Sequence, residues 1–269
     1  MKSSALVLSG GGTLGTAHIG VLKSLVTRYQ FDFLCGVSAG AIVAGFLAVE
    51  FQPEQIWDIV CHTSIFPNML DLGKNSFGLV AGDRIIELLK THLGEVEFAD
   101  LDYPLYIGAT DFKTGKNVAL SQGKLTDAIR ASISVPVLFS PYYHPEYDQW
   151  LVDGGLSQTF PLDLAIDRYQ GDQIIGIDVI GQINPDVDFS QSGPSIPPID
   201  QISKIRPVLE RSIRIMQMNQ EAYFRSDQRV KIIRPPLTDY TSYDITKMES
   251  IYQIGLESGR TFVDANSRK

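Results

Sequence analysis

The chain has 269 residues, a formal net charge of -8 at pH 7 and an isoelectric point near 5.0. An acidic chain of this kind is not expected to bind nucleic acid. Its 44% hydrophobic and 20% charged residues are ordinary for a globular protein, and its length suits a single domain, residues 1–269, with a substantial core.

Two cysteines, Cys35 and Cys61, are too few for a disulfide framework and form no metal-binding pattern. Both suit a reducing compartment. Only four consecutive apolar residues, 5–8, precede the first glycines, which is too short for a signal peptide. The longest nearly apolar run, 37–49, is too short and too rich in glycine to cross a bilayer. We therefore expect a cytoplasmic protein without a metal site.

The first elements alternate between strand and helix. Residues 5–8 form a continuous apolar run, which is typical of a strand buried on both faces. Residues 16–25 have helical periodicity, and residues 31–35 form a second apolar strand. This alternation predicts an α/β fold with a mainly parallel central sheet.

The glycine loop after the first strand has two interpretations. Its pattern Gly10-x-Gly12-x-x-Gly15 fits a dinucleotide-binding fingerprint, which requires an acid at the end of the second strand. Residues 35–38 stand there and include no acid. Alternatively, the bare N–H groups of Gly10, Gly11 and Gly12 form an oxyanion hole. We favour the oxyanion hole, because loops that follow adjacent parallel strands lie side by side.

The second strand ends in the sequence Gly36-Val37-Ser38-Ala39-Gly40, followed by a run of small and apolar residues. A strand, a Gly-x-Ser-x-Gly turn and a helix together predict a nucleophile elbow, which exposes the serine hydroxyl at the edge of the sheet. The positive N-terminal end of the helix then points at Ser38 and favours an alkoxide there.

The remaining elements follow from periodicity and from glycine and proline positions. We predict loops over 66–78, 140–147 and 181–199, the second rigid and aromatic and the third a possible flap. Helices are predicted over 53–63, 83–93, 126–132 and 203–223, and residues 243–246 lead into a last helix that runs through residue 262. Strands are predicted over 105–110, 117–121, 150–153, 174–180 and 230–233.

A nucleophilic serine needs a base, which is usually a histidine held by an acid. The four histidines are His18, His62, His92 and His144, and none follows Asp153. The order serine, acid, histidine of α/β-hydrolases therefore cannot be built with Asp153, and we expect the histidines to be structural. Asp153 itself ends an apolar strand, where α/β sheets carry their sites, although Asp-Gly is also a common turn pair.

Four motifs together resemble the patatin-like phospholipases over roughly residues 5–180. They are the glycine loop continuing to Leu22, the elbow at Ser38, the segment Arg130-Ala131-Ser132-x-x-x-Pro136-x-x-Phe139 and the motif Asp153-Gly154-Gly155. The resemblance implies a three-layer α/β/α sandwich and a dyad of Ser38 as nucleophile and Asp153 as base, with no histidine. It also implies cleavage of acyl esters of phospholipids and other lipids without a metal or cofactor.

Two positions depart from the family pattern. Leu14 stands where family members often carry Arg or Lys, and Thr159, ahead of Pro161, stands where they often have Asn. The first departure removes a positive charge from the oxyanion loop. Both positions bear on the activity that the resemblance implies, while the two dyad residues are present.

The resemblance implies that Asp153 takes the Ser38 proton while the amides of Gly10, Gly11, Gly12 and Ala39 hold the oxyanion. Gly36, Gly40, Gly154 and Gly155 would shape the two turns. The alternatives are a lipid-binding relative without catalysis and, less favoured, a dinucleotide-binding protein.

The charge of the chain is uneven. Residues 201–234 carry eight Lys or Arg against three acids. This segment is either a solvated helix face or a surface for anionic lipid, and with a lipid substrate it predicts peripheral membrane contact. Within the domain, we expect a core over about 5–180, a loop over 181–200 and completing helices and a strand over 201–269.

Overall fold

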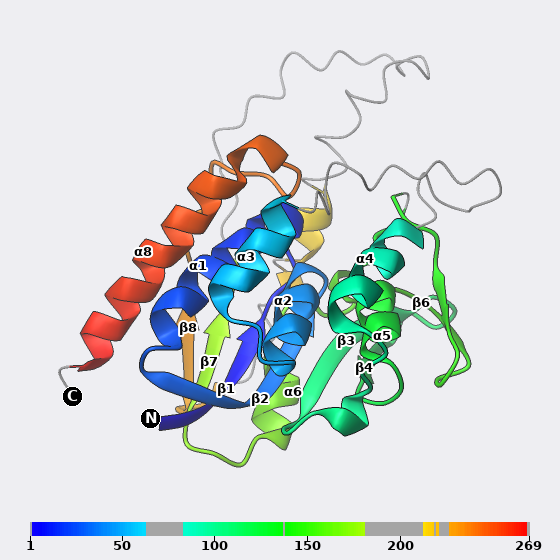
Figure 1. Cartoon of the computed structure of the whole chain (residues 1–269), viewed down its shortest axis with the longest axis horizontal. Helices are drawn as coiled ribbons and strands as arrows, with labels where there is room; N and C mark the ends of the chain where they lie inside the picture. Colours follow the sequence, from blue (N-terminus) through cyan, green and yellow to red (C-terminus); the bar gives the residue numbers. More distant parts are fainter. Residues whose placement is uncertain are drawn as a thin grey trace.

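The computed structural model describes residues 2–62, 83–136, 138–180, 212–217, 219–220 and 226–267 (Figure 1). These residues form an eight-stranded sheet in the order β5-β6-β3-β2-β1-β7-β8, with β4 paired to β3 outside this path. The strands are β1 (Lys2–Leu8), β2 (Tyr29–Val37), β3 (Leu105–Asp111), β4 (Asn117–Leu120), β5 (Tyr142–His144), β6 (Gln149–Asp153), β7 (Ile174–Ile177) and β8 (Val230–Ile233).

The sheet is mainly parallel. Strands β3, β2, β1, β7 and β8 pair in parallel along the sheet, whereas β4, β5 and β6 form antiparallel pairs at one side. Parallel pairing requires a crossover between consecutive strands, and the alternating helices provide it.

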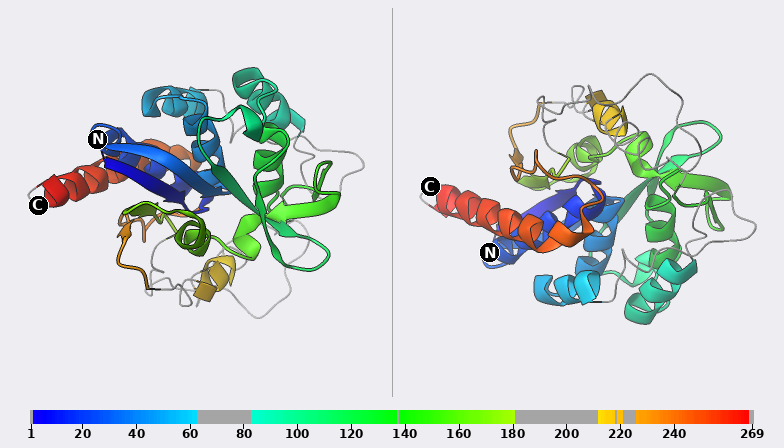
Figure 2. Two further views of the ribbon diagram at one scale, coloured as in Figure 1. Left: turned by 90° about the horizontal axis from the view of Figure 1, so that it is seen from below. Right: turned by 90° about the horizontal axis from the view of Figure 1, so that it is seen from above.

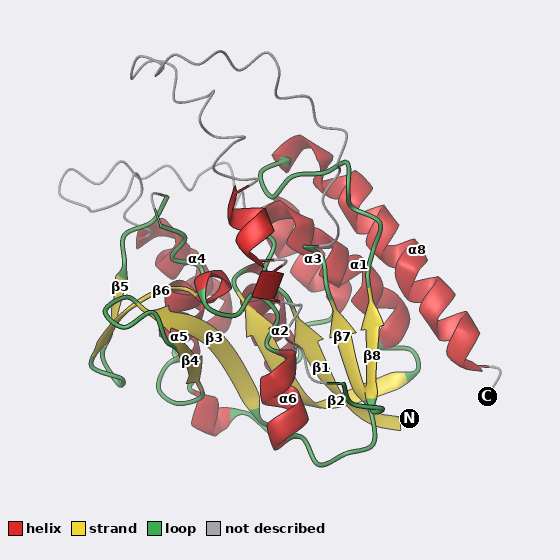
Figure 3. Cartoon of the chain, turned by 180° about the vertical axis from the view of Figure 1, so that it is seen from behind, coloured by secondary structure: helices red, strands yellow, loops and turns green. Residues whose placement is uncertain are grey.

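Helices cover both faces of the sheet, as the views from below, above and behind show (Figures 2 and 3). The helix α6 (Leu162–Arg168) lies on one face. The other face carries α1 (Thr16–Leu25), α2 (Ala39–Ala48), α3 (Pro53–His62), α4 (Asp83–Leu93), α5 (Leu125–Ser132) and α8 (Met248–Ser267). Short 3-10 helices include η1 (Gly12–Gly15), η2 (Phe98–Asp100), η3 (Gly154–Leu156) and η5 (Ile245–Lys247).

The core has two parts because side chains alternate across a strand. On β1, Leu6 and Leu8 pack into the large cluster beneath α1 and α2, while Ala5 and Val7 pack into the cluster beneath α6. All four are fully buried. The three-layer α/β/α fold with a mainly parallel sheet is therefore confirmed. None of the described helices is long and apolar enough to span a bilayer.

The predicted aromatic loop over 140–147 is wrong in part. Residues 142–144 form β5, in which Tyr143 pairs with Trp150 of β6. Proline has no N–H group to donate to a sheet. Pro141 and Pro145 flank β5 rather than interrupt it, so the three residues between them are free to pair.

Several predictions lie outside the described residues: the loops over 66–78 and 181–199 and most of the helix over 203–223. Within that last range, residues 212–217 are helical. The division of the chain at about residues 180 and 200 stays a prediction. Helix α6 has only seven residues, too few for a helical period to stand out in the sequence.

Candidate active site

Three segments meet at one edge of the sheet: the glycine loop after β1, the turn after β2 and the end of β6. The register of the strands brings the last two to the same height. Val37 of β2 pairs with Gly108 of β3, and Ala109 of β3 pairs with Asp153 of β6. The ends of β2 and β6 therefore lie level, on either side of β3.

Two glycines allow the residues on either side of β3 to approach one another. A Cβ atom on Gly154 would lie 2.4 Å from the Gly108 carbonyl oxygen and 3.0 Å from Val37 Cγ1. A Cβ atom on Gly108 would lie 2.6 Å from Val37 Cγ2. Neighbouring strands are about 4.8 Å apart, so two residues flanking a middle strand reach one another only where that strand carries nothing between them. Gly108 leaves this space open, and Gly154 lets η3 close over it.

Ser38 stands at the turn between β2 and α2 in a strained conformation. Its φ of 52° and ψ of -118° fall where residues other than glycine are rarely found. A Cβ atom on Gly36 would lie 2.5 Å from the Gly40 carbonyl oxygen, so the strand and helix approach too closely for side chains. This is the geometry of a nucleophile elbow, and Ser38 is 8% exposed.

The strained turn is held by a serine that lies 94 residues away in the chain. The backbone N–H of Ser38 donates to Ser132 Oγ at 2.8 Å, and this hydroxyl donates to the Gly108 carbonyl oxygen at 2.6 Å. Ser132 is fully buried at the end of α5. It therefore ties the elbow to β3 and occupies the N–H group of Ser38.

Asp153 is buried, with 5% of its surface exposed. Its Oδ1 accepts a hydrogen bond from the Gly155 N–H at 2.7 Å, while Oδ2 is buried without a hydrogen-bond partner among the described residues. Burial raises the pKa of Asp153 to about 6, and the nearby Ser38 hydroxyl and the Gly155 N–H oppose this rise. A carboxylate with a pKa near neutrality, beside a serine hydroxyl, suits a general base.

The glycine loop lies against the elbow. A Cβ atom on Gly10 would be 3.5 Å from Ser38 Cβ, and one on Gly15 would be 2.5 Å from Ala39 Cβ. The N–H groups of Gly11, Gly12 and Ala39 donate no hydrogen bond within the described part of the chain. These three groups are thus available to a ligand oxygen near Ser38.

Gly10 differs from its neighbours. Its N–H donates to the Thr159 carbonyl oxygen at 2.9 Å. Gly10 was predicted as an oxyanion donor, but its N–H group already has an acceptor. Thr159 Oγ1 in turn donates to the Gly155 carbonyl oxygen at 3.0 Å. Thr159 therefore ties the glycine loop to the turn that carries Asp153.

Gly12 is required by its backbone conformation as well as by space. Its φ of +57° is the left-handed region that favours glycine. A Cβ atom there would lie 2.4 Å from the Ser242 carbonyl oxygen. The same carbonyl accepts the Thr13 N–H at 3.0 Å, so the segment before α8 supports the glycine loop from outside.

Two of the histidines, His18 and His144, are buried, and within the described part of the chain they make no hydrogen bond to the candidate dyad. The His18 Nε2 lies 2.8 Å from the Ser9 carbonyl oxygen, and burial lowers the pKa of His18 to about 4, so the ring is neutral. His144 lies in β5, where burial lowers its pKa and its ring stands nearly perpendicular to that of Tyr147. No hydrogen bond in the described residues joins either ring to the Ser38 or Asp153 side chain.

Leu14, one of the two departures from the family pattern, is fully buried in the large core cluster. The described residues bring together no group of three His, Cys, Asp or Glu side chains that could hold a metal ion. In the sequence, Ser132 stands out only as part of the motif that begins at Arg130, and nothing marks Gly108. No local pattern could reveal either role, because both arise where distant segments pack together.

Comparison with known proteins establishes the family. The family profile described as "Patatin-like phospholipase" matches residues 6–166, which contain the glycine loop, the elbow and the turn after β6. The chain therefore belongs to the patatin-like phospholipase family, and the resemblance inferred from the motifs is confirmed.

Related sequences span bacteria and animals. An uncharacterized NTE family protein of Mycobacterium tuberculosis is 33% identical over 59% of this chain and 44% of its own length. Patatin-like phospholipase domain-containing protein 6 of Homo sapiens is 27% identical over 98% of this chain and 20% of its own. The corresponding values for neuropathy target esterase sws of Drosophila melanogaster are 24%, 99% and 20%. The chain thus spans less than half the length of these relatives.

Among solved structures, VipD from Legionella pneumophila has the same fold. Its TM-score is 0.62 at 15% sequence identity, over 98% of this chain and 67% of VipD.

Proposed function

We propose that the chain is a serine lipid acyl hydrolase that cleaves fatty acyl esters through a Ser38–Asp153 dyad and an acyl-enzyme. The observation that carries the proposal is the pairing of a strained, slightly exposed serine with a buried aspartate whose pKa is raised to about 6. Membership of the patatin-like phospholipase family and the esterase and phospholipase names of its relatives support a lipid ester as substrate.

The reaction begins with proton transfer. The Asp153 carboxylate takes the proton of Ser38 Oγ as this oxygen bonds to the ester carbonyl carbon. The carbonyl oxygen becomes an oxyanion, which accepts hydrogen bonds from the free N–H groups of Gly11, Gly12 and Ala39. The bond to the alcohol then breaks, and Asp153 returns its proton to the departing oxygen.

The second half of the reaction repeats the first with water. Asp153 takes a proton from a water molecule, the water oxygen bonds to the acyl carbon, and the bond to Ser38 Oγ breaks as the proton returns to it. The fatty acid is released and the dyad is restored. Both halves require ionised Asp153, which predominates above pH 6.

The test compares wild type, Ser38→Ala and Asp153→Asn in hydrolysis of p-nitrophenyl butyrate and of phosphatidylcholine. Intact mass is measured after reaction with a fluorophosphonate. We expect one adduct on the wild type and none on Ser38→Ala, and turnover reduced by about 10⁴ or more in both variants. The controls are Ser267→Ala and Asp264→Asn, because both residues are exposed on α8. Equal turnover in Asp153→Asn and wild type would refute the dyad.

Peripheral membrane contact remains a prediction. Four basic residues of the segment 201–234 are described, and each donates to or pairs with protein groups: Arg214, Arg229, Lys231 and Arg234. The prediction of a free basic surface therefore rests on Lys204, Arg206, Arg211 and Arg225, which lie outside the described residues.

A further inference from the structure

The side-chain amide of Gln220, which lies 61 residues after Thr159, holds the turn that carries Asp153. Gln220 Oε1 accepts a hydrogen bond from the Thr159 N–H at 2.9 Å. Gln220 Nε2 donates to the carbonyl oxygens of Leu156 and Gly155, at 3.1 and 3.4 Å. A flipped amide would set its nitrogen against an N–H group and its oxygen against two carbonyl oxygens, so these three contacts fix its orientation.

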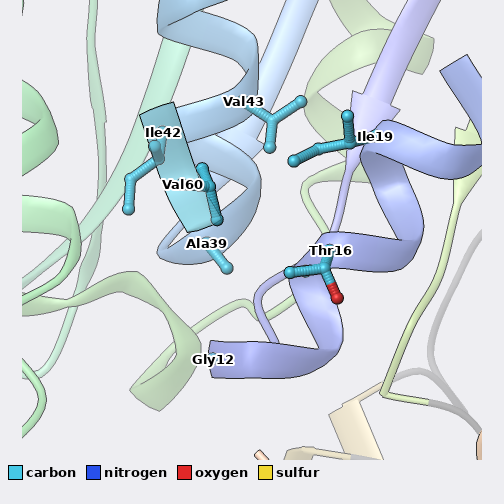
Figure 4. Close-up of a pocket in the computed structure, with 8 residues that line it drawn as sticks. Gly12, Thr16, Ile19, Ala39, Ile42, Val43 and Val60 are labelled. Atoms are coloured by element: carbon cyan, nitrogen blue, oxygen red, sulfur yellow. The ribbon is translucent and has the colours of Figure 1, made fainter. Parts of the chain in front are cut away.

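The glycine loop forms another side of the same site. Gly12 of this loop lies beside Ala39 at the start of α2 (Figure 4). The Gly10 N–H of the same loop donates to the Thr159 carbonyl oxygen at 2.9 Å. Thr159 is 1% exposed, and its own N–H donates to Gln220. Through Thr159, Gln220 is therefore connected to the loop of the proposed oxyanion hole as well as to the turn after Asp153.

The helical segment that carries Gln220 is fixed at a second point. Residues 212–217 of this segment are the yellow helix in Figure 2. Arg214 Nη2 and Nε donate to the Ile180 carbonyl oxygen at 2.7 and 3.1 Å, and Arg214 Nη1 donates to the Tyr240 carbonyl oxygen at 3.1 Å. Because Arg214 anchors the segment, a substitution of Gln220 should release the turn after Asp153 and leave the segment in place.

We propose that Gln220 is a positioning residue of the reaction, which keeps the Asp153 carboxylate beside Ser38 by holding the turn that follows β6. The proposal rests on the proposed function, since it adds a residue to the same site. Asp153 Oδ1 accepts the Gly155 N–H at 2.7 Å, so a displacement of Gly155 displaces the carboxylate. Gln220 lies beyond residues 6–166, which match the family profile, so this support comes from the C-terminal part of the chain.

Two effects distinguish this role from a contribution to stability alone. The Gly155 N–H lowers the pKa of Asp153, against the larger effect of burial. A looser turn weakens this hydrogen bond, so the pKa of Asp153 rises and the low-pH limb of the kcat/KM profile moves to higher pH. A displaced base also slows the chemical step without weakening substrate binding, so kcat falls while KM changes little.

The test compares wild type, Gln220→Leu and Asn219→Leu in hydrolysis of p-nitrophenyl butyrate as a function of pH. Asn219 is the matched control, because it is the neighbouring amide and is exposed. Gln220→Leu should lower kcat about tenfold or more, since a misplacement of about 1 Å can cost about 10²-fold, and should move the low-pH limb upward. Asn219→Leu should keep the wild-type profile. Gln220→Glu, which has the same shape but sets an oxygen against two carbonyl oxygens, serves if leucine prevents folding.

A measurement without turnover separates this inference from the proposed function. Hydrogen–deuterium exchange, followed by mass spectrometry, reports on the peptide that covers residues 153–160. Exchange there should be faster in Gln220→Leu than in wild type and Asn219→Leu, whether or not any ester is hydrolysed. Unchanged exchange would overturn the role of Gln220. Ester hydrolysis with a wild-type kcat and an unmoved low-pH limb in both Gln220 variants would also overturn it, and would leave the dyad standing.

Discussion

Replacing Asp153 by Asn should stabilise the fold while it removes activity. The raised pKa of Asp153 means that ionising this buried carboxyl group costs free energy in the folded protein. A rise from 3.8 to about 6, at about 1.4 kcal/mol for each pH unit, corresponds to about 3 kcal/mol. Asn is neutral at every pH and retains an oxygen that can accept the Gly155 N–H, so the variant avoids this cost.

The stability of the wild type relative to Asp153→Asn should fall as the pH rises. Below the unfolded pKa of 3.8, the carboxyl is neutral in both states and carries no penalty. As the pH rises through about 6, the unfolded state is already ionised and the folded state must follow, so wild-type stability falls. The free energy of unfolding of Asp153→Asn should exceed that of the wild type by about 1 kcal/mol at pH 4.5 and about 3 kcal/mol at pH 7.5.

Urea unfolding followed by circular dichroism at the two pH values measures this difference. Asp264→Asn, at an exposed site on α8, is the control and should show no comparable change with pH. A difference between Asp153→Asn and wild type that does not grow with pH would refute the argument. The burial of Asp153 would then not be what raises its pKa, and its assignment as a base poised near neutrality would lose its support.

Two further predictions concern the groups that hold the site. Ser132→Ala leaves the Ser38 N–H buried without a partner and should lower the free energy of unfolding by about 1–3 kcal/mol. Because the elbow loses its support, kcat should fall more than tenfold with little change in KM. An unchanged kcat would contradict this role of Ser132. Gly12→Ala should abolish turnover and lower the melting temperature, since its Cβ meets a carbonyl oxygen at 2.4 Å. Gly94→Ala, at a similar φ of +63° but with open space around its Cβ, should cost only about 1 kcal/mol and keep full activity. Equal losses of stability in the two variants would show that backbone strain, not the close contact, causes the loss.

The site has a simple physical design. Ser38 and Asp153 come from strands on opposite sides of β3, and glycine at 108 and 154 removes the side chains that would hold them apart. Ser132 and Thr159 then connect the segments by hydrogen bonds, one beneath the elbow and one between the glycine loop and the Asp153 turn. Substitutions at these positions should affect activity without touching the reacting atoms.

Much of the fold could be predicted from local patterns. Apolar runs such as 5–8 and 31–35 identified buried strands, and the spacing of apolar residues identified the helices over 16–25, 53–63 and 83–93. The hairpin strand at 142–144 was missed, because its flanking prolines are equally typical of loops and its pairing with β6 depends on the rest of the sheet.

The site, like the fold, could be predicted in part from local sequence patterns and depended in part on the tertiary structure. Motifs around Ser38 and Asp153 are local and specific, so the sequence by itself singled out the two groups and the glycine loop. Their closeness, the supporting hydrogen bond from Ser132, the engagement of Gly10 with Thr159 and the raised pKa of Asp153 were decided by the tertiary structure. The reason is physical: contacts between segments tens of residues apart depend on strand order and register, and a pKa depends on burial, which exists only once the layers have packed.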